Sequence, residues 1–220
     1  MPRRPRRGTA GLVFHIMNRS ARRLPLFEDD EDYATFLHVL VEAHACIPVR
    51  ILCYTLMPNH WHLVLWPSQD NDLSRFMAWL TGTHVRRWHL RNRSVGTGTI
   101  YQGRYKAIPV KDDRHFLVVC RYVERNPVRA RLASSAEDWR WSSASAVQCG
   151  PRITLDAWPV ARPEPWMEYL NREERPGEFE PLRHAIQTGV PFGPDTWQVE
   201  TMARLDWRLG LRPRGRPRAA

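Results

Sequence analysis

The sequence predicts an α+β fold, and three observations lead to that prediction. Short apolar runs of strand length alternate with longer segments whose apolar residues recur every three or four positions. Stretches rich in proline, asparagine or glycine separate these segments and are typical of turns. With 43% apolar residues among 220, the chain can bury a core of ordinary domain size.

The chain is expected to begin with a strand, a helix and a second strand. Residues 12–17 form the first strand, and the acidic cluster at 28–32 opens a helix. Acidic side chains are favourable at the positive end of a helix dipole, and the apolar residues that follow keep helical spacing. Pro48 ends this segment, and residues 49–56 form the second strand.

A tight turn should connect the second strand to a third. Pro58 and Asn59 fit the central pair of such a turn, and residues 60–66 then form the third strand. Asp72 is suited to cap the helix that follows, whose apolar residues continue to Trp88.

The glycine- and threonine-rich residues 94–99 form a loop before the last elements of the pattern. A fourth strand is expected at residues 105–110, where Pro109 indicates an edge strand or an early end. Asp112 or Asp113 then begins a further helix.

The first six elements follow the order strand, helix, strand, strand, helix, strand, which is the split βαβ pattern of ferredoxin-like folds. In that topology the first and third strands are central, so residues 60–66 lie in the middle of an antiparallel sheet. Helices would cover one face of the sheet, and functional groups could occupy the other face.

Periodicity weakens beyond Trp139, where prolines accumulate and only two more helices are expected, at 166–172 and 195–209. The later region is interpreted as a C-terminal extension of one domain. We expect four parts along the chain: a basic N-terminal arm at 1–10, a main domain at 11–145, a partly helical extension at 146–209 and a basic tail at 210–220.

The distribution of charge predicts a polyanionic partner. Arginines place eight positive charges in the two acid-free termini, which leaves about +2 of the formal +10 for the rest of the chain. Residues 73–110 also contain seven Arg or Lys residues and no acid, interleaved with aromatic side chains. Such a stripe suits a nucleic acid, which offers phosphates and stacking bases, whereas the alternative is a solvated helix face.

Cysteine usage and hydropathy indicate a location. The four cysteines have no paired spacing, and no apolar signal region follows the first arginines, so a reducing cytoplasm is expected, with nucleoid association if DNA is the partner. No apolar run reaches the length needed to span a membrane.

Two histidines separated by one residue, His60 and His62, begin the third strand. Alternate side chains of a strand point to the same face, so the two imidazoles emerge side by side while Trp61 points away. This geometry can chelate a metal ion if a further ligand is supplied, although two histidines that are merely hydrogen-bonded are the alternative. His15 could reach the same face but is not included in the expected ligand set.

Tyr122 and Asn126 lie four positions apart on the last helix and would share a face. A tyrosine hydroxyl can attack a phosphodiester once its proton is removed, and an amide oxygen can complete a metal site. Alternatively, Tyr122 packs and Asn126 caps a helix that begins at Pro127. Spacing by itself also leaves Tyr101 and Tyr105 as candidate nucleophiles.

With these residues in these positions, the chain resembles the REP-associated tyrosine transposases, a branch of the small single-tyrosine HUH transposases. Four segments carry the resemblance in this order: "HIMNRSARRLPLF" at 15–27, "MPNHWHLVLWP" at 57–67, "YQGRYKAIPV" at 101–110 and "RYVERNPVRARL" at 121–132. HUH denotes histidine, hydrophobic residue, histidine, here residues 60–62. The resemblance covers residues 12–140, and the closing "RPRGRPR" is similar to basic tails of this branch.

The resemblance implies that Tyr122 is the nucleophile and that His60, His62 and Asn126 hold magnesium (Mg2+) or manganese (Mn2+). Related insertion-sequence enzymes commonly carry glutamine where this chain has Asn126. The implied substrate is single-stranded DNA with palindromic REP hairpins, cut beside the hairpin through a 5′-phosphotyrosine that leaves a free 3′-hydroxyl. No membrane is implied, and the protein would act as a monomer or homodimer.

The expected DNA contacts share a positive charge and a place in the basic stripe or the tail. Tail arginines interspersed with proline and glycine suit a narrow minor groove, whereas a disordered solubilising end is the alternative. The DNA-binding candidates are Arg86, Arg87, Arg104, Lys106, Arg214, Arg216 and Arg218.

Two other classes of protein remain open. One is a regulator that binds hairpin DNA on the same fold without cutting it. The other is a zinc protein that uses His60, His62 and a cysteine such as Cys53.

Overall fold

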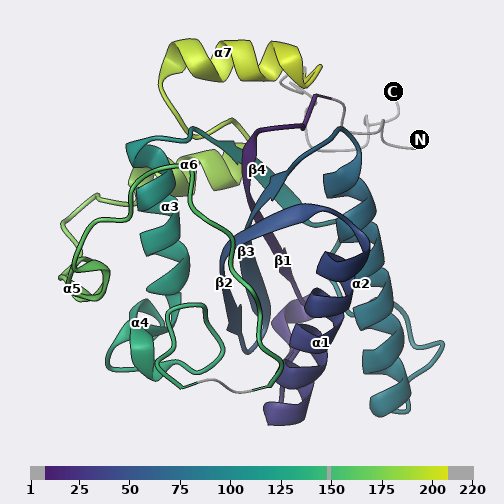
Figure 1. The fold of residues 1–220 in the computed structure, drawn as a ribbon. Helices are drawn as coiled ribbons and strands as arrows, with labels where there is room; N and C mark the ends of the chain where they lie inside the picture. The colour runs from purple at the N-terminus through teal and green to yellow at the C-terminus, as the bar shows by residue number, and fades with distance from the viewer. Residues whose placement is uncertain (1–7, 148–149, 208–220) are drawn as a thin grey trace, which may run out of the picture.

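The molecule is built on a four-stranded antiparallel sheet with the strand order β2-β3-β1-β4 (Figure 1). The computed structural model describes residues 8–147 and 150–207. The strands are β1 (Val13–Arg19), β2 (Val49–Met57), β3 (His60–Pro67) and β4 (Lys106–Val110). With β1 and β3 in the centre, this is the ferredoxin-like arrangement that the element order predicts.

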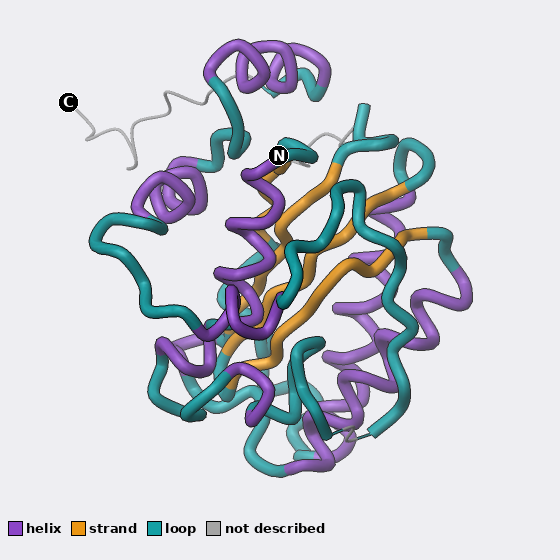
Figure 2. Tube along the Cα trace, turned by 60° about the vertical axis from the view of Figure 1, so that its left-hand side comes forward, coloured by secondary structure: helices purple, strands orange, loops and turns teal. Residues whose placement is uncertain are grey.

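Two long helices, α1 (Asp30–Cys46) and α2 (Asp72–Arg91), cover one face of this sheet (Figures 1 and 2). Alternate residues of the central strands point into the core beneath them, because side chains of a strand alternate between faces. This core contains Ile16 from β1 and Trp61 from β3, both fully buried. No helix in the described ranges is both long and apolar enough to cross a bilayer.

The opposite face is covered in part by α3 (Arg114–Glu124), which follows the split βαβ pattern (Figures 1 and 2). The residues between those of the first core, such as Val13 and Val64, pack here against Phe116 and Val119. The sheet therefore has a buried core on each side. The short elements are the 3-10 turns η1 (Ala21–Arg23) and η2 (Ala136–Asp138) and the helix α4 (Asn126–Arg129).

Acidic residues begin the long helices, but not always as the sequence suggests. The Asp29 carboxylate caps α1 by accepting from the amides of residues 31 and 32, and Asp113 caps α3 through the His115 amide at 2.8 Å. The expectation for Asp72 was wrong in detail. Asn71 occupies the cap position with a φ of 71°, and the Asp72 carboxylate accepts from the preceding Gln69 amide at 3.2 Å.

The later region wraps around α3 and contacts both edges of the sheet. Asp156 bonds the backbone of Ile51 in β2, with its amide donating at 2.9 Å and its carboxylate accepting at 2.8 Å. At the other edge the Phe192 amide donates to Pro109 of β4 at 2.8 Å. Both edge strands are thereby protected from pairing with another chain.

This region contains three helices, α5 (Trp166–Asn171), α6 (Glu180–Thr188) and α7 (Asp195–Arg204). α5 and α7 match the two expected helices, although α7 ends at Arg204. α6 was not expected from the sequence. Its local signals are Pro181 in the first turn and Gly189, which ends the helix with a φ of 83°.

Candidate active site

His60 and His62 lie next to each other on the α3 face of β3. Their ring centroids are 5.1 Å apart, with the rings nearly perpendicular at 84°, while Trp61 is buried in the opposite core. The two-residue period of the strand accounts for this, since it turns both imidazoles to one face.

A third histidine, His15 on β1, joins the pair. Its Nε2 atom is 2.9 Å from Nδ1 of His62, and the two rings stack with centroids 5.1 Å apart. The antiparallel register of β1 and β3 brings the two residues together. His15 lies opposite Val64, two residues along β3 from His62, so the two side chains are diagonal neighbours on one face of the sheet. The sequence signal for His15 was its strand parity, but the register could not be predicted locally.

All three histidines are held in the neutral form. Burial, assisted by the charge of Arg129, lowers the pKa of His15 to about 3. Burial and the nearby charges of Arg19 and Arg129 lower the pKa of His60 to about 4. The pKa of His62 lies well below its ordinary value, chiefly because of burial. Neutral imidazoles retain a lone pair that can bind a metal ion.

Hydrogen bonds engage the Nδ1 side of both β3 imidazoles. His60 Nδ1 lies 2.7 Å from Asn59 Oδ1, and an amide oxygen only accepts, so Nδ1 carries the proton and Nε2 the lone pair. His62 uses Nδ1 toward His15. Within the described ranges no hydrogen bond involves Nε2 of either ring. This pattern is typical of metal-ligating histidines, whose second nitrogen is oriented by a neighbour.

Tyr122 lies beside this cluster on α3 of the same chain. Its ring centroid is 5.9 Å from that of His62 and 6.0 Å from that of His15, with the planes close to perpendicular. The half-buried ring is also contacted by Phe179 at 5.3 Å and by the Arg129 guanidinium at 4.0 Å.

The other two candidate tyrosines lie elsewhere. The Tyr101 hydroxyl is buried under α2, where it accepts from Trp61 Nε1 at 3.1 Å and lies 2.7 Å from His84 Nδ1. Burial raises its pKa above the ordinary value. Tyr105 packs against the same α1/α2 core. Of the three tyrosines, only Tyr122 faces the histidine cluster.

Asn126 is buried, but it does not continue α3. That helix ends at Glu124, and Asn126 begins α4 after Arg125, because Pro127 has no amide hydrogen to donate to the preceding helical turn. The simple expectation of one continuous helix face shared with Tyr122 is therefore not met. Within the described ranges the Asn126 side chain makes no hydrogen bond.

A cavity of about 520 Å³ opens in front of the His60 and His62 rings. Three cationic side chains contribute to its wall, so its charge suits an anionic ligand. Arg19 among them was not expected, although it shares strand parity with His15. The lining residues are Met17, Asn18, Arg19, His60, His62, Gln102, Gly103, Arg104, Lys106 and Ile186.

The other predicted DNA contacts are not gathered at this cavity. Arg86 and Arg87 lie on α2, on the opposite side of the sheet, and Arg87 forms an ion pair with Glu42 of α1 at 2.7 Å. The three tail arginines, Arg214, Arg216 and Arg218, lie outside the described residues, as do positions 1–7 of the N-terminal arm.

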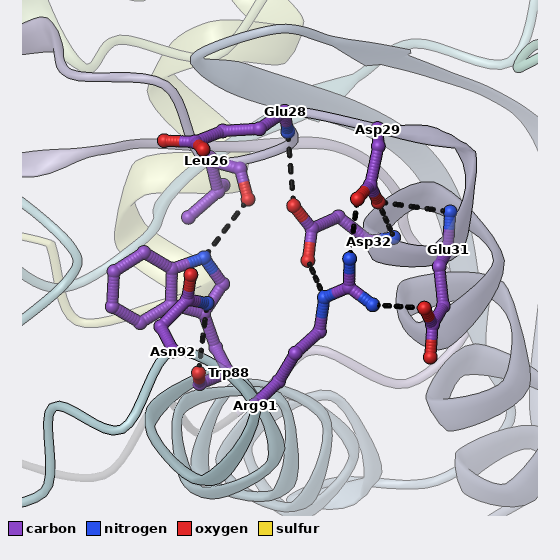
Figure 3. Close-up of polar contacts among 8 residues, drawn as sticks. All are labelled: Leu26, Glu28, Asp29, Glu31, Asp32, Trp88, Arg91 and Asn92. Carbon is purple, nitrogen blue, oxygen red and sulfur yellow. Dashed lines mark hydrogen bonds and ion pairs between the residues drawn. The ribbon is translucent and has the colours of Figure 1, made fainter.

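The fold neutralises part of the acid-free stretch with acids from α1. Arg91 at the end of α2 pairs with Asp29, Glu31 and Asp32, the last at 2.8 Å (Figure 3). Arg87 and Arg91 are thus paired with acids of the same chain, and the DNA contacts expected for Arg86 and Arg87 stay predictions.

The described residues give the zinc alternative no support. No group of three or more His, Cys, Asp and Glu side chains there could hold a metal ion. Cys53 is buried and its thiol bonds to Cys120 of α3 instead of facing the histidine pair.

One face of the sheet thus combines paired histidines, a tyrosine-bearing helix beside them and a cationic cavity that the histidines line. The family model described as "Transposase IS200 like" matches residues 9–126, which include the four strands, both histidines and Tyr122. The match spans more than half of the chain, and the protein belongs to this family of transposases.

One solved structure shares the fold, and a second resembles the chain more weakly. A REP-associated tyrosine transposase bound to a REP hairpin is 20% identical, with a TM-score of 0.51 over 70% of this chain and 98% of that one. A crystal structure from Deinococcus radiodurans R1, of a protein provisionally described as a transposase, is 19% identical with a TM-score of 0.39, over 60% and 92% of the two chains. No curated protein matches the sequence.

Proposed function

We propose that this protein is a metal-dependent endonuclease and strand transferase that cuts single-stranded DNA beside palindromic, REP-type hairpins through a 5′-phosphotyrosine intermediate. The observation that carries the proposal is the approach of the Tyr122 ring to 5.9 Å from the His62 ring within one chain. Membership of the transposase family supports a DNA substrate. The catalytic unit would be residues 11–145, and one chain would suffice for a site.

His60, His62 and Asn126 would hold Mg2+ or Mn2+. Both imidazoles are neutral and keep Nε2 outside other hydrogen bonds of the described ranges, and a buried amide with no such bond is a suitable third ligand. When bound, the ion would polarise a non-bridging phosphate oxygen and stabilise the charge that develops there. Two imidazoles and one amide leave positions for substrate oxygens.

Tyr122 would perform the covalent step. Its hydroxyl loses a proton to solvent and its oxygen bonds to phosphorus, while the bond from phosphorus to the 3′-oxygen breaks and that oxygen takes up a proton. One phosphodiester is exchanged for another, so a 3′-hydroxyl can later attack the phosphotyrosine and release the phenol. Rejoining of the DNA strands therefore requires no nucleoside triphosphate, in agreement with the lack of a phosphate-binding glycine loop in the sequence.

The cationic side chains around the cavity would hold the DNA. Arg19, Arg104 and Lys106 line the wall beside His60, where they can contact phosphates on either side of the cut. We propose that the basic tail, with Arg214, Arg216 and Arg218, contributes a further contact in a minor groove. The hairpin preference is proposed from the fold shared with the hairpin-bound transposase.

The test is the formation of a covalent adduct. Purified protein is incubated with labelled single-stranded hairpin DNA and Mn2+, and the products are separated under denaturing conditions. We expect an adduct with the wild type and with Tyr105→Phe as the matched control, none with Tyr122→Phe, and no cutting with His60→Ala. Binding should survive in Tyr122→Phe.

Two results would count against the proposal. An adduct that persists in Tyr122→Phe would assign the nucleophile to another residue. Hairpin binding by the wild type without any adduct, in Mg2+ as well as Mn2+, would identify the protein as a non-cleaving regulator on the same fold.

A further inference from the structure

Three arginines follow one another at intervals of four along α3 and α4: Arg121, Arg125 and Arg129. The Arg125 amide donates to the Arg121 carbonyl at 3.0 Å and the Arg129 amide to the Arg125 carbonyl at 3.1 Å, so these three residues keep helical spacing across the break between the helices and form a ridge beside Tyr122. The first two members are neutralised by the C-terminal extension. Arg121 pairs with Glu178, and Arg125 Nε lies 3.4 Å from Glu174 Oε1.

Arg129 differs from its two neighbours in its lack of an acid, since no carboxylate in the described ranges lies within ion-pair distance of it. Its Nη1 atom is buried without a hydrogen-bond partner there; Arg125 Nε and Glu174 Oε1 also lack a hydrogen bond, but those two atoms form an ion pair with each other. A buried donor that lacks a partner costs about 1–3 kcal/mol, so folded proteins rarely leave one unless a ligand or water completes it.

The position of Arg129 indicates where such a ligand would lie. Its guanidinium carbon is 4.0 Å from the centroid of the Tyr122 ring and 5.7 Å from that of Phe179. Its charge also contributes to lowering the pKa of His15, His60 and His62, which places it within electrostatic reach of the whole cluster.

A cation–π contact with Tyr122 does not account for all of this. Stacking uses the flat face of the guanidinium, whereas its N–H groups point outward in its plane and still need acceptors. The planar fork of arginine matches the oxygens of a phosphate, and it stays charged when buried. An oxyanion held beside the Tyr122 phenol would accept from the unpartnered N–H groups of Arg129 and would also balance its positive charge.

We propose that Arg129 contacts a non-bridging oxygen of the phosphodiester that Tyr122 attacks. This inference rests on the proposed function and adds a catalytic residue to it. As the bond from the Tyr122 oxygen to phosphorus forms and the bond to the 3′-oxygen breaks, Arg129 donates hydrogen bonds to the phosphate and transfers no proton. Glu174 and Glu178 neutralise the other members of the ridge, so the charge is concentrated at Arg129.

The first part of the test measures adduct formation. Arg129→Gln should slow it by about 100-fold, as the loss of a single oxyanion donor does elsewhere, and Arg129→Lys by less, since it keeps the charge but loses the fork. Arg114→Gln is the control, because this exposed arginine at the other end of α3 is about 12 Å from Tyr122 along the helix. Thermal melting of each variant verifies folding.

The second part separates a phosphate contact from a purely structural role. In the non-cleaving Tyr122→Phe background, binding is measured with and without Arg129→Gln, to DNA whose scissile phosphate is intact or replaced by a neutral methylphosphonate. Arg129→Gln alone and the methylphosphonate alone should each weaken binding by about 10-fold. The two changes combined should weaken it by little more than about 10-fold, since they remove the same interaction.

Each other outcome has a defined meaning. Losses that multiply, or an adduct rate in Arg129→Gln equal to that of the wild type, would overturn the contact while leaving the proposed function intact. Failure of the wild type to cut any hairpin DNA would overturn the proposed function, and this inference with it.

Discussion

The two faces of the sheet each hold a histidine beside a tyrosine, yet the pairs differ in what surrounds them. Under α1 and α2, the Tyr101 hydroxyl is enclosed by Trp61 Nε1 and His84 Nδ1 in a buried network. Under α3, the half-buried Tyr122 lies beside His62, and His62 itself lines a cationic cavity. The same residue types are thus structural where the tyrosine hydroxyl is engaged by buried partners, and suited to chemistry where the hydroxyl bonds to no described residue.

The charges follow the same division. On the α1/α2 face, arginines of α2 pair with acids of α1, as for Arg87 with Glu42 and for Arg91 with Asp29, Glu31 and Asp32 (Figure 3). Around the cavity, Arg19 and Arg104 form no ion pair with any described residue. Sequence charge therefore indicates a DNA surface only after the pairing imposed by the fold is known.

The largest effect expected from this comparison is on catalysis. His62→Ala should lower the rate of adduct formation by about 10³-fold, because loss of a metal ligand removes several kcal/mol of transition-state stabilisation. His84→Ala on the other face should leave that rate nearly unchanged at temperatures where the variant is folded. Single-turnover kinetics measure both, and calorimetric titration with Mn2+ should show weakened binding for His62→Ala alone. Equal losses would show that the two faces do not differ in function.

The next effect is on stability, and it should be large on the α1/α2 face and small on the α3 face. Tyr101→Phe leaves Trp61 Nε1 and His84 Nδ1 without their partner and should lower the free energy of unfolding by about 1–3 kcal/mol. Tyr122→Phe, whose hydroxyl bonds to no described residue, should change it by less than about 0.5 kcal/mol. Urea denaturation gives both values. A larger loss in Tyr122→Phe would mean that its hydroxyl serves the fold.

A pH dependence follows from His84. Burial lowers its pKa in the folded protein from 6.5 to about 3, so between these values the unfolded chain binds more protons. The contribution of the neutral, buried His84 to the free energy of unfolding is complete above pH 6.5 and is lost progressively as the pH falls toward 3. At pH 4.5, two units below the unfolded pKa, the loss is roughly 3 kcal/mol, since each pKa unit corresponds to about 1.36 kcal/mol. In urea denaturation at pH 7 and 4.5, His84→Gln should show a smaller decrease than the wild type, and an unchanged decrease would contradict the assignment.

The smallest effect concerns DNA affinity. Arg104→Gln should weaken hairpin binding and reduce the slope of log affinity against log salt by about 1, as expected for loss of one phosphate contact. Arg87→Gln should leave the slope unchanged, because its partner is Glu42. Binding titrations at several salt concentrations distinguish the two. A reduced slope in Arg87→Gln would indicate that α2 contacts the DNA.

Local periodicity accounts for what could be predicted. Alternation along a strand turns His60 and His62 to one face whatever lies next to it, and the order of elements implies central positions for β1 and β3. By contrast, α6 was missed because the prolines around it obscure a helical pattern whose apolar residues pack against the α3 core.

By itself, then, the sequence determined the ferredoxin-like order of elements, the paired imidazoles and the family resemblance, since each depends on neighbouring residues. Only the tertiary structure decided which tyrosine faces the pair, that His15 bonds to His62, and that Arg129 stays without an acid among the described residues while Arg121 is neutralised. Strand register and helix packing join positions tens of residues apart, and no local pattern specifies these contacts.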